Sequence, residues 1–370
     1  MRQPARNLRA FIKIFKFMWY NDNWGYRIKI TVQNGKVDDD LSDFPCYVNL
    51  DDLPDAFFTH VKNGGGDIRI TKADGETELA REVVSCDTGT KTGEVHFLAD
   101  ALSKDDDTDF YIYYGNDDAD DYAVGATYGR NAVWADYAFV SHDGGITDSA
   151  GNLSPANHDT VNEAAGKIGN CRSFNGSDQY IDLGTDTVVF GSNPSVWSAS
   201  LWFKPDSITG SHNLLSAYDS ASGADQNHAI NMLTSANDFR WEVKQNNTAT
   251  EFQYEPPVVI DEWHKIGFTM NKNGLLKGYG NGALRNSDDA PTTGDYTDGG
   301  QVRLGVFKYN NNLAYFYDGD IDEVRIITGV EWTAEFISTE YNNQSDTGTF
   351  YDIGAEEPLP SAFIPQAIIF

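Results

Sequence analysis

Short runs of alternating apolar and polar residues, separated by turn-forming dipeptides, constrain this fold more than any other feature of the chain. Tyr26–Val32 alternates with a period of two, as a half-buried β-strand does. Turn signals such as Asn34-Gly35 separate this run from the next. Comparable runs follow at 46–50, 67–71, 82–86, 93–97 and 110–114. Strands at this spacing, with no helix of ordinary length among them, predict an antiparallel β-sandwich or barrel.

The same pattern continues through the second half of the chain. Only residues 333–343 have helical character, with Thr333 as N-cap and with Trp332 and Ile337 spaced as a hydrophobic staple. A length of 370 residues suffices for two domains that each bury a core. We therefore predict an all-β protein of two antiparallel β-sandwich domains, at 22–135 and 136–357. Strand candidates of the second domain lie at 171–174, 180–183, 197–203, 239–243, 263–269, 276–279, 302–306 and 321–327.

Both ends of the chain are apolar and lie outside these two domains. In residues 1–21, arginines precede an apolar run that Lys13 and Lys16 interrupt; it is too short to span a bilayer and lacks a small-x-small cleavage site. The tail at 358–370 is apolar and contains two further prolines after Pro358. We expect an anchoring arm and a docking tail that attach an oligomeric protein to other structural proteins of an assembly, without a transmembrane segment.

An excess of acidic residues limits the partners of the chain. Asp and Glu number 56 against 27 Lys and Arg, so the net charge is −29. A surface of this sign repels a phosphate backbone, which excludes nucleic acid as the expected partner. Runs such as 38–40 and 105–107 favour solvated loops over cation sites. Cys46, Cys86 and Cys171 favour buried free thiols, with a Cys46–Cys86 pair left open.

Four motifs of the second domain occur in the order of a known family: 166–183, Ser198–Pro205, Glu262–Ile266 and Tyr317–Ile326. With these motifs, the second domain resembles the laminin-G-like, concanavalin A-like jelly rolls. The first domain is similar to an uncharacterised β-sandwich module that often precedes such domains in bacterial, archaeal and phage surface proteins. Its resemblance is carried by Trp24–Arg27, 67–71, 111–116 and, beyond the second domain, by 350–357.

The resemblance implies a structural Ca²⁺ site. In similar jelly rolls, an aspartate at the position of Asp322 holds Ca²⁺ together with groups at the start of the domain. Here the start of the domain offers Asp148 and Asn152, which supply the oxygen ligands that hard cations prefer. The alternative is that Asp322 caps a turn and Asp148 begins one.

The resemblance also implies glycan binding by an aromatic ring that stacks on a sugar. Trp241, Tyr254, His212 and His228 lie in the variable middle of the domain and are the candidates, with core packing or an ordinary surface ring as the alternative for each. Related β-glucanases carry Glu-x-Asp-x-Glu, whereas in this chain no Glu has an Asp two positions later. We therefore expect that the chain is not an enzyme.

Together these features predict a non-enzymatic structural or adhesive surface protein with a glycan-binding type of jelly roll. The first hypothesis is a phage virion component, a capsid decoration or tail adhesin, at the virion surface and in contact with cell-surface glycans. The alternative is a bacterial surface or secreted carbohydrate-binding protein, which would be extracellular. The third hypothesis is a glycoside hydrolase or polysaccharide lyase.

Overall fold

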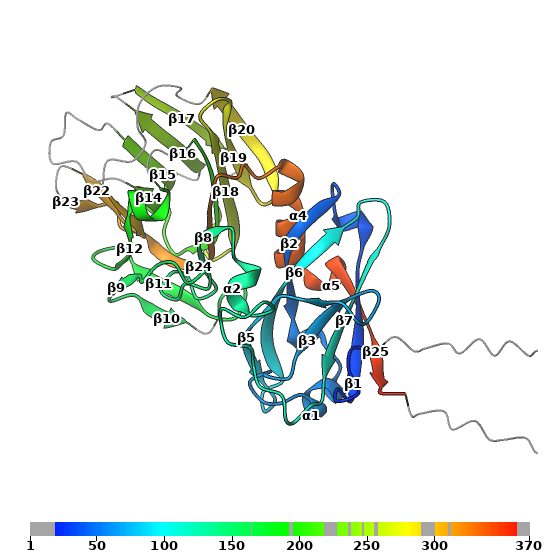
Figure 1. The fold of residues 1–370 in the computed structure, drawn as a ribbon. Helices are drawn as coiled ribbons and strands as arrows, with labels where there is room; N and C mark the ends of the chain where they lie inside the picture. Colours follow the sequence, from blue (N-terminus) through cyan, green and yellow to red (C-terminus); the bar gives the residue numbers. More distant parts are fainter. Residues whose placement is uncertain are drawn as a thin grey trace, which may run out of the picture.

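Two antiparallel β-sandwiches form the molecule, with helix α4 (Ala334–Ser345) between them (Figure 1). The all-β prediction is confirmed. The computed structural model describes residues 19–163, 165–191, 195–217, 228–235, 238–245, 248–254, 258–289, 300–309 and 312–360. Most of the predicted arm and tail, at 1–18 and 361–370, therefore lies outside the described residues.

The first domain packs a five-stranded sheet, in the order β25-β1-β7-β3-β4, on a three-stranded sheet, β2-β6-β5. Alternate residues of these strands fill the core between the sheets; Ile28, Val48, Phe97 and Ile112 are each fully buried. The strands of the domain are β1 (Tyr26–Val32), β2 (Leu41–Asn49), β3 (Arg69–Lys72), β4 (Glu78–Leu79), β5 (Arg81–Asp87), β6 (Thr92–Leu102) and β7 (Thr108–Tyr114), with a short α-helix, α1 (Asp55–His60), and two 3₁₀ turns, η1 (Asn34–Lys36) and η2 (Leu50–Asp52).

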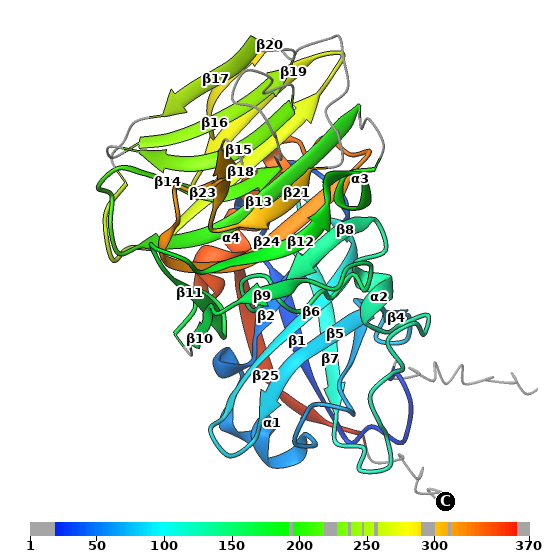
Figure 2. The same ribbon diagram turned by 90° about the vertical axis from the view of Figure 1, so that its left-hand side faces the viewer.

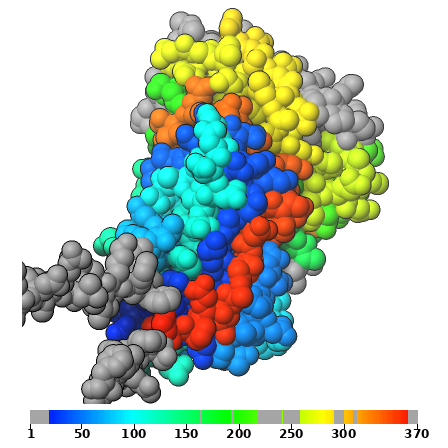
Figure 3. Space-filling model, turned by 90° about the vertical axis from the view of Figure 1, so that its right-hand side faces the viewer, coloured from blue at the N-terminus to red at the C-terminus, as the bar shows by residue number. Residues whose placement is uncertain are grey.

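The last strand that the structure describes, β25 (Tyr351–Pro358), belongs to the first domain. It pairs antiparallel with β1, from Tyr26 opposite Pro358 to Val32 opposite Tyr351. Figure 3 shows this C-terminal segment, in red, along the blue N-terminal strand. The predicted limit of the second domain at residue 357 is therefore corrected, because residues 351–357 complete the first sheet. The similarity of 350–357 to the first module already pointed to this arrangement.

The second domain is a two-layer jelly roll (Figure 2). One sheet has the order β10-β11-β24-β13-β18-β19-β20, with β8 also paired to β24, and the other has the order β17-β16-β15-β14-β21-β12-β9. Trp197, Phe268 and Trp241 are among the fully buried side chains of the core cluster. The strands are β8 (Tyr137–Ser141), β9 (Ala156–His158), β10 (Val161–Glu163), β11 (Cys171–Asn175), β12 (Tyr180–Thr185), β13 (Val196–Pro205), β14 (Ser211–Ala217), β15 (His228–Ser235), β16 (Asp238–Gln245), β17 (Thr248–Tyr254), β18 (His264–Asn271), β19 (Leu275–Gly280), β20 (Ala283–Asp289), β21 (Gln301–Leu304), β22 (Phe307–Tyr309), β23 (Asn312–Ala314) and β24 (Asp318–Thr328).

Helix α4 begins where the sequence predicts it. The Thr333 hydroxyl accepts a hydrogen bond from the Phe336 N–H at 3.1 Å, and Trp332 and Ile337 lie in one buried cluster. The face of α4 that the two domains bury is largely polar and carries Glu340, Asn343 and Gln344. The remaining helices are single turns, α2 (Arg130–Val133), α3 (Asp186–Val189) and α5 (Thr347–Phe350).

Cys46, Cys86 and Cys171 are buried thiols, as the sequence favoured, and no disulfide joins Cys46 to Cys86. In the described part of the chain, no helix has both the length and the apolar character needed to cross a membrane.

Candidate functional site

The residues predicted to bind Ca²⁺ make contacts of another kind. The Asp148 carboxylate accepts four backbone N–H groups: Val140 and Ala150 on Oδ1, and Asn152 and Leu153 on Oδ2, at 2.7–3.1 Å. These bonds use the lone pairs that a cation would need, so the contacts of Asp148 fit a turn rather than a calcium ligand.

The other two predicted calcium ligands are also engaged with the backbone. Asp322 is fully buried and accepts the N–H groups of Ile168 and Glu323, at 2.9 and 2.8 Å. The Asn152 side chain donates to the Tyr137 carbonyl at 2.9 Å. Calcium binding stays a prediction that these contacts do not support.

The four predicted glycan residues are not brought together by what the structure describes. Trp241 is fully buried in the jelly-roll core, so its ring cannot stack on a sugar and this candidate is corrected. His212 is also buried, and its two ring nitrogens lie 2.8 and 3.2 Å from the carbonyls of Phe316 and Thr209. The side chains of His228 and Tyr254 lie outside the described residues.

A pocket of about 410 Å³ lies between the two domains. Its floor reaches three buried side chains: Glu82 from β5, Glu94 from β6, and His142, which follows β8. Its remaining walls come from the first domain, the junction and the start of the second domain: Arg81, Val83, Val84, Ser85, Asp121, Tyr122, Val124, Arg130, Asp143, Thr147, Ser149, Gly169 and Asn170.

His142 lies at the centre of a cluster of carboxylates and a second histidine. Its Nδ1 is 2.6 Å from Glu323 Oε1 and 3.4 Å from Glu94 Oε1, while its Nε2 is 3.2 Å from Glu82 Oε2. The His96 ring stacks on the His142 ring at 4.2 Å between centroids, and His96 Nε2 lies 2.8 Å from Glu94 Oε1. All five side chains are buried, which is rare for ionisable groups.

Local structure explains how each element delivers its side chain. Glu94 and His96 are two residues apart on β6, so both point to the same face of the strand. Glu323 lies at a bulge in the pairing of β24 with β13 and has a φ of 47°. A non-glycine residue in this left-handed region costs about 1–3 kcal/mol, and such residues concentrate at functional sites.

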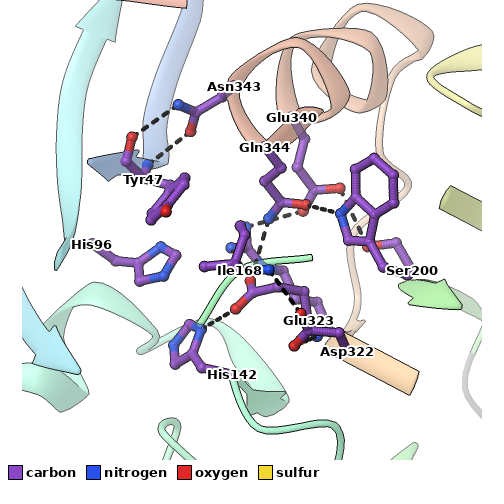
Figure 4. A network of polar contacts seen from close by, with 12 residues as sticks. Tyr47, His96, His142, Ile168, Ser200, Asp322, Glu323, Glu340, Asn343 and Gln344 are labelled. Atoms are coloured by element: carbon purple, nitrogen blue, oxygen red, sulfur yellow. Dashed lines mark hydrogen bonds and ion pairs between the residues drawn. The ribbon is translucent and has the colours of Figure 1, made fainter. Parts of the chain in front are cut away.

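A second layer of ion pairs connects the cluster to helix α4 (Figure 4). Arg325 joins Glu323 and Glu340, at 2.8 and 3.0 Å, and Lys265 pairs with the other oxygen of Glu340 at 2.9 Å. Gln344 donates to Glu323 at 3.3 Å. Helix α4 therefore holds charged side chains of the jelly roll in place next to the first domain.

Burial and neighbouring charges shift the pKa values of the histidines in opposite directions. Burial lowers the pKa of His142, but Glu323 and Glu82 outweigh this effect and raise it well above its usual value. Burial lowers the pKa of His96, and the charge of His142 lowers it further.

The pKa values of the carboxyl groups are also shifted in opposite directions. Burial raises the pKa of Glu94 to about 8. Burial also acts to raise the pKa of Glu323, but His142 and Arg325 reverse this effect and hold it below its usual value. Titratable groups whose pKa values are shifted in opposite directions beside a pocket mark a candidate functional site.

Sequence reasoning missed this cluster. Its members come from two domains and are separated by up to 241 residues, from Glu82 to Glu323. The available signals were the Glu94-Val95-His96 strand motif and His142 directly before Asp143-Gly144-Gly145. Neither signal indicates which residues complete the cluster, because only the packing of the two domains brings the members together.

Comparison with known proteins bears on the jelly roll. Residues 175–335 match the family described as the concanavalin A-like lectin/glucanases superfamily. This segment is a concanavalin A-like jelly-roll domain. No curated protein matches the chain.

Several solved structures are similar to part of this chain. The binding domain of botulinum neurotoxin serotype G has 18% identity over 57% of this chain and 52% of its own, with a TM-score of 0.46. The binding domain of Paraclostridial Mosquitocidal Protein 1 has 13% identity over 56% and 52%, with a TM-score of 0.46. Each match spans about half of the toxin domain.

A third structure is domain 4 of AbnA, a GH43 extracellular arabinanase from Geobacillus stearothermophilus, in complex with arabinotriose. It has 23% identity over 54% of this chain and 93% of its own, with a TM-score of 0.42.

Proposed function

We propose that this chain is a non-enzymatic structural or adhesive surface protein whose concanavalin A-like domain binds glycans. The observation that carries the proposal is the jelly roll itself, since residues 175–335 match a superfamily described by its lectins and glucanases. The first domain packs against this domain where Glu82 and Glu94 face His142, and α4 does so through the Glu340–Arg325 ion pair, which suits a rigid unit that displays a binding surface.

The carboxylates on β24 support the non-enzymatic part of the proposal. Asp320 pairs with Lys204 at 2.7 Å, Asp322 accepts two backbone N–H groups, and Glu323 pairs with Arg325. Asp322 and Glu323 are fully buried, so a polysaccharide cannot reach either. The third hypothesis is a glycoside hydrolase or polysaccharide lyase. Release of reducing ends or unsaturated products from cell-wall or algal polysaccharides would support that hypothesis and contradict our proposal.

The proposed setting is the surface of a phage virion, as a capsid decoration or tail adhesin, with residues 1–21 and 358–370 holding an oligomer on the particle. The alternative is a bacterial surface or secreted carbohydrate-binding protein. The apolar character of both segments supports attachment to an assembly. Deleting residues 1–18 should abolish co-sedimentation with the particle, whereas unchanged co-sedimentation would favour the alternative.

A glycan array probed with the full chain tests the binding function. We expect saturable binding to a defined group of glycans, reproduced in solution by calorimetry with the best glycan. An array without hits at high protein concentration would contradict glycan binding and leave a purely structural role.

A further inference from the structure

We propose that Glu94, His96, His142 and Glu323 form a binding site for one divalent transition-metal ion, of the Zn²⁺ class, which joins the two domains. Within the described part of the chain, one ligand atom from each of these residues lies within 4.8 Å of all the others. The site is independent of the glycan function proposed above.

The spacing of the ligand atoms fits a small cation. Bonds of about 2.0–2.2 Å in a tetrahedral site place neighbouring ligand atoms about 3.3–3.6 Å apart. Three separations among these atoms, His142 Nδ1 to Glu323 Oε1, His96 Nε2 to Glu94 Oε1, and His142 Nδ1 to Glu94 Oε1, are 2.6, 2.8 and 3.4 Å. Only small side-chain movements are needed to open this arrangement around an ion.

The donor set selects the class of metal. Two imidazole nitrogens and two carboxylate oxygens suit Zn²⁺ and its transition-metal neighbours. Ca²⁺ and Mg²⁺ prefer oxygen ligands throughout, which this cluster does not supply.

The groups behind the ligands also have the arrangement of a metal site. The second nitrogen of His142 faces Glu82, as metal-binding imidazoles commonly face a carboxylate. Glu82 is itself fixed by Trp134 Nε1 at 2.6 Å and the Ser149 hydroxyl at 2.7 Å. Arg325 holds the second oxygen of Glu323. These residues position the ligands and do not touch the ion.

The charges around the cluster leave room for a cation. Arg325 and Lys265 pair with Glu323 and Glu340, whereas the carboxylates of Glu82 and Glu94 pair with histidines rather than with Lys or Arg. A divalent cation among the four ligands would add positive charge beside these carboxylates.

An entry path and a structural role follow from the position of the cluster. The pocket of about 410 Å³ reaches Glu94 and His142 from outside. Glu94 and His96 come from the first domain, and His142 and Glu323 come from the second, so the ion would crosslink them. Metal binding of this kind adds to folding free energy.

The test is a Zn²⁺ titration of the full chain after chelator treatment, with a chromophoric chelator as competitor and elemental analysis of the product. We expect one Zn²⁺ per chain and a thermal midpoint about 5 °C higher with Zn²⁺ than with chelator. Co²⁺ in place of Zn²⁺ should give the visible absorption of a tetrahedral site. Wild-type protein that stays metal-free under these conditions, or binds only non-stoichiometrically, overturns the proposal.

Variants locate the ion. H142Q should lose at least about 100-fold in affinity, and E82Q about 10–100-fold, since Glu82 only positions His142. The matched control is H158N, because His158 also faces a carboxylate, Asp182 at 3.3 Å, outside the cluster. Equal affinity in H142Q and wild type would overturn the assignment, and if H142Q does not fold, H96Q and the wild-type titration decide.

Discussion

At the scale of single residues, Glu340 shows how a buried carboxylate stabilises this molecule. Its two oxygens accept Arg325 and Lys265, and all three side chains are almost completely buried. Removing one partner of such a group leaves an uncompensated charge, which costs about 3–5 kcal/mol. We therefore expect E340Q to lower the free energy of unfolding by about this amount at pH 7, measured by urea denaturation.

The same variant predicts a dependence on pH. Burial raises the pKa of Glu340, but Lys265 and Arg325 outweigh it and hold the pKa below its usual value of 4.5. A lowered folded pKa gives stability that is present above pH 4.5 and is lost as the pH falls through the folded pKa. The gap between wild type and E340Q should therefore narrow from pH 7 to pH 3.5. E331Q, at a partly exposed pair with Lys277, is the control and should cost less than about 1 kcal/mol. A constant gap for E340Q would contradict the pKa direction.

Trp241 provides a second prediction at this scale. Because the ring is fully buried in the jelly-roll core, W241A should cost about 3–5 kcal/mol through the cavity it leaves. W241F should cost less and should retain any glycan binding. Urea denaturation measures the loss, and W263A, at a partly exposed ring over Lys204, is the control with a smaller effect. Loss of glycan binding in a stably folded W241F would return Trp241 to the binding site.

Single site residues were the least predictable part of the sequence. The composition of a strand does not reveal which of its faces meets the second sheet, so Trp241 was as good a candidate for a sugar platform as for the core. His142 and Glu323 lie far apart in the sequence, and each is an ordinary polar residue until the domains pack. The family resemblance predicted a calcium site at Asp148 and Asp322, but the carboxylate oxygens of both residues accept backbone N–H groups.

At the scale of elements, local signals were sufficient for most strands and for α4. Period-two alternation located β1, whereas β13 and β24 were recognised as strand-like runs and are buried along almost their whole length. Several strands were missed, among them β8, β14, β15 and β17, and β20, an edge strand whose residues are mostly exposed and polar. The predicted domain limits also placed β25 in the second domain, because a strand carries no mark of the sheet that it joins.

The cap of α4 gives a prediction for an element. Thr333 accepts the Phe336 N–H, so T333A should cost about 1 kcal/mol of stability, while T333S should keep the bond and most of the stability. Because α4 carries Glu340 and Gln344, fraying of its first turn should also loosen the interface between the domains. Thermal unfolding measures both variants, and equal losses for T333A and T333S would show that the hydroxyl does not matter.

At the scale of the whole molecule, the first and last of the described strands, β1 and β25, pair in the same sheet, so the first domain is complete only when β25 has joined it. The β25 strand brings Tyr351, which donates its hydroxyl to Asp52 at 3.1 Å, and Glu356, which lies 3.0 Å from His60. Six residues of β1 pair with this strand. A chain that ends at residue 350 therefore exposes the edge of β1 and part of the first core.

This topology predicts the behaviour of two truncated chains. A chain of residues 1–350 should unfold at a lower thermal midpoint than the full chain. It should also become sensitive to limited proteolysis at β1 and β2. A chain of residues 1–360 keeps β25 and should melt as the full chain does. Because α4 and the buried ion pairs couple the two domains, the full chain should unfold in a single calorimetric transition. Equal midpoints for the two truncations would mean that β25 is only an accessory edge, whereas a lower midpoint for 1–350 alone makes the C-terminal strand an integral part of the first domain.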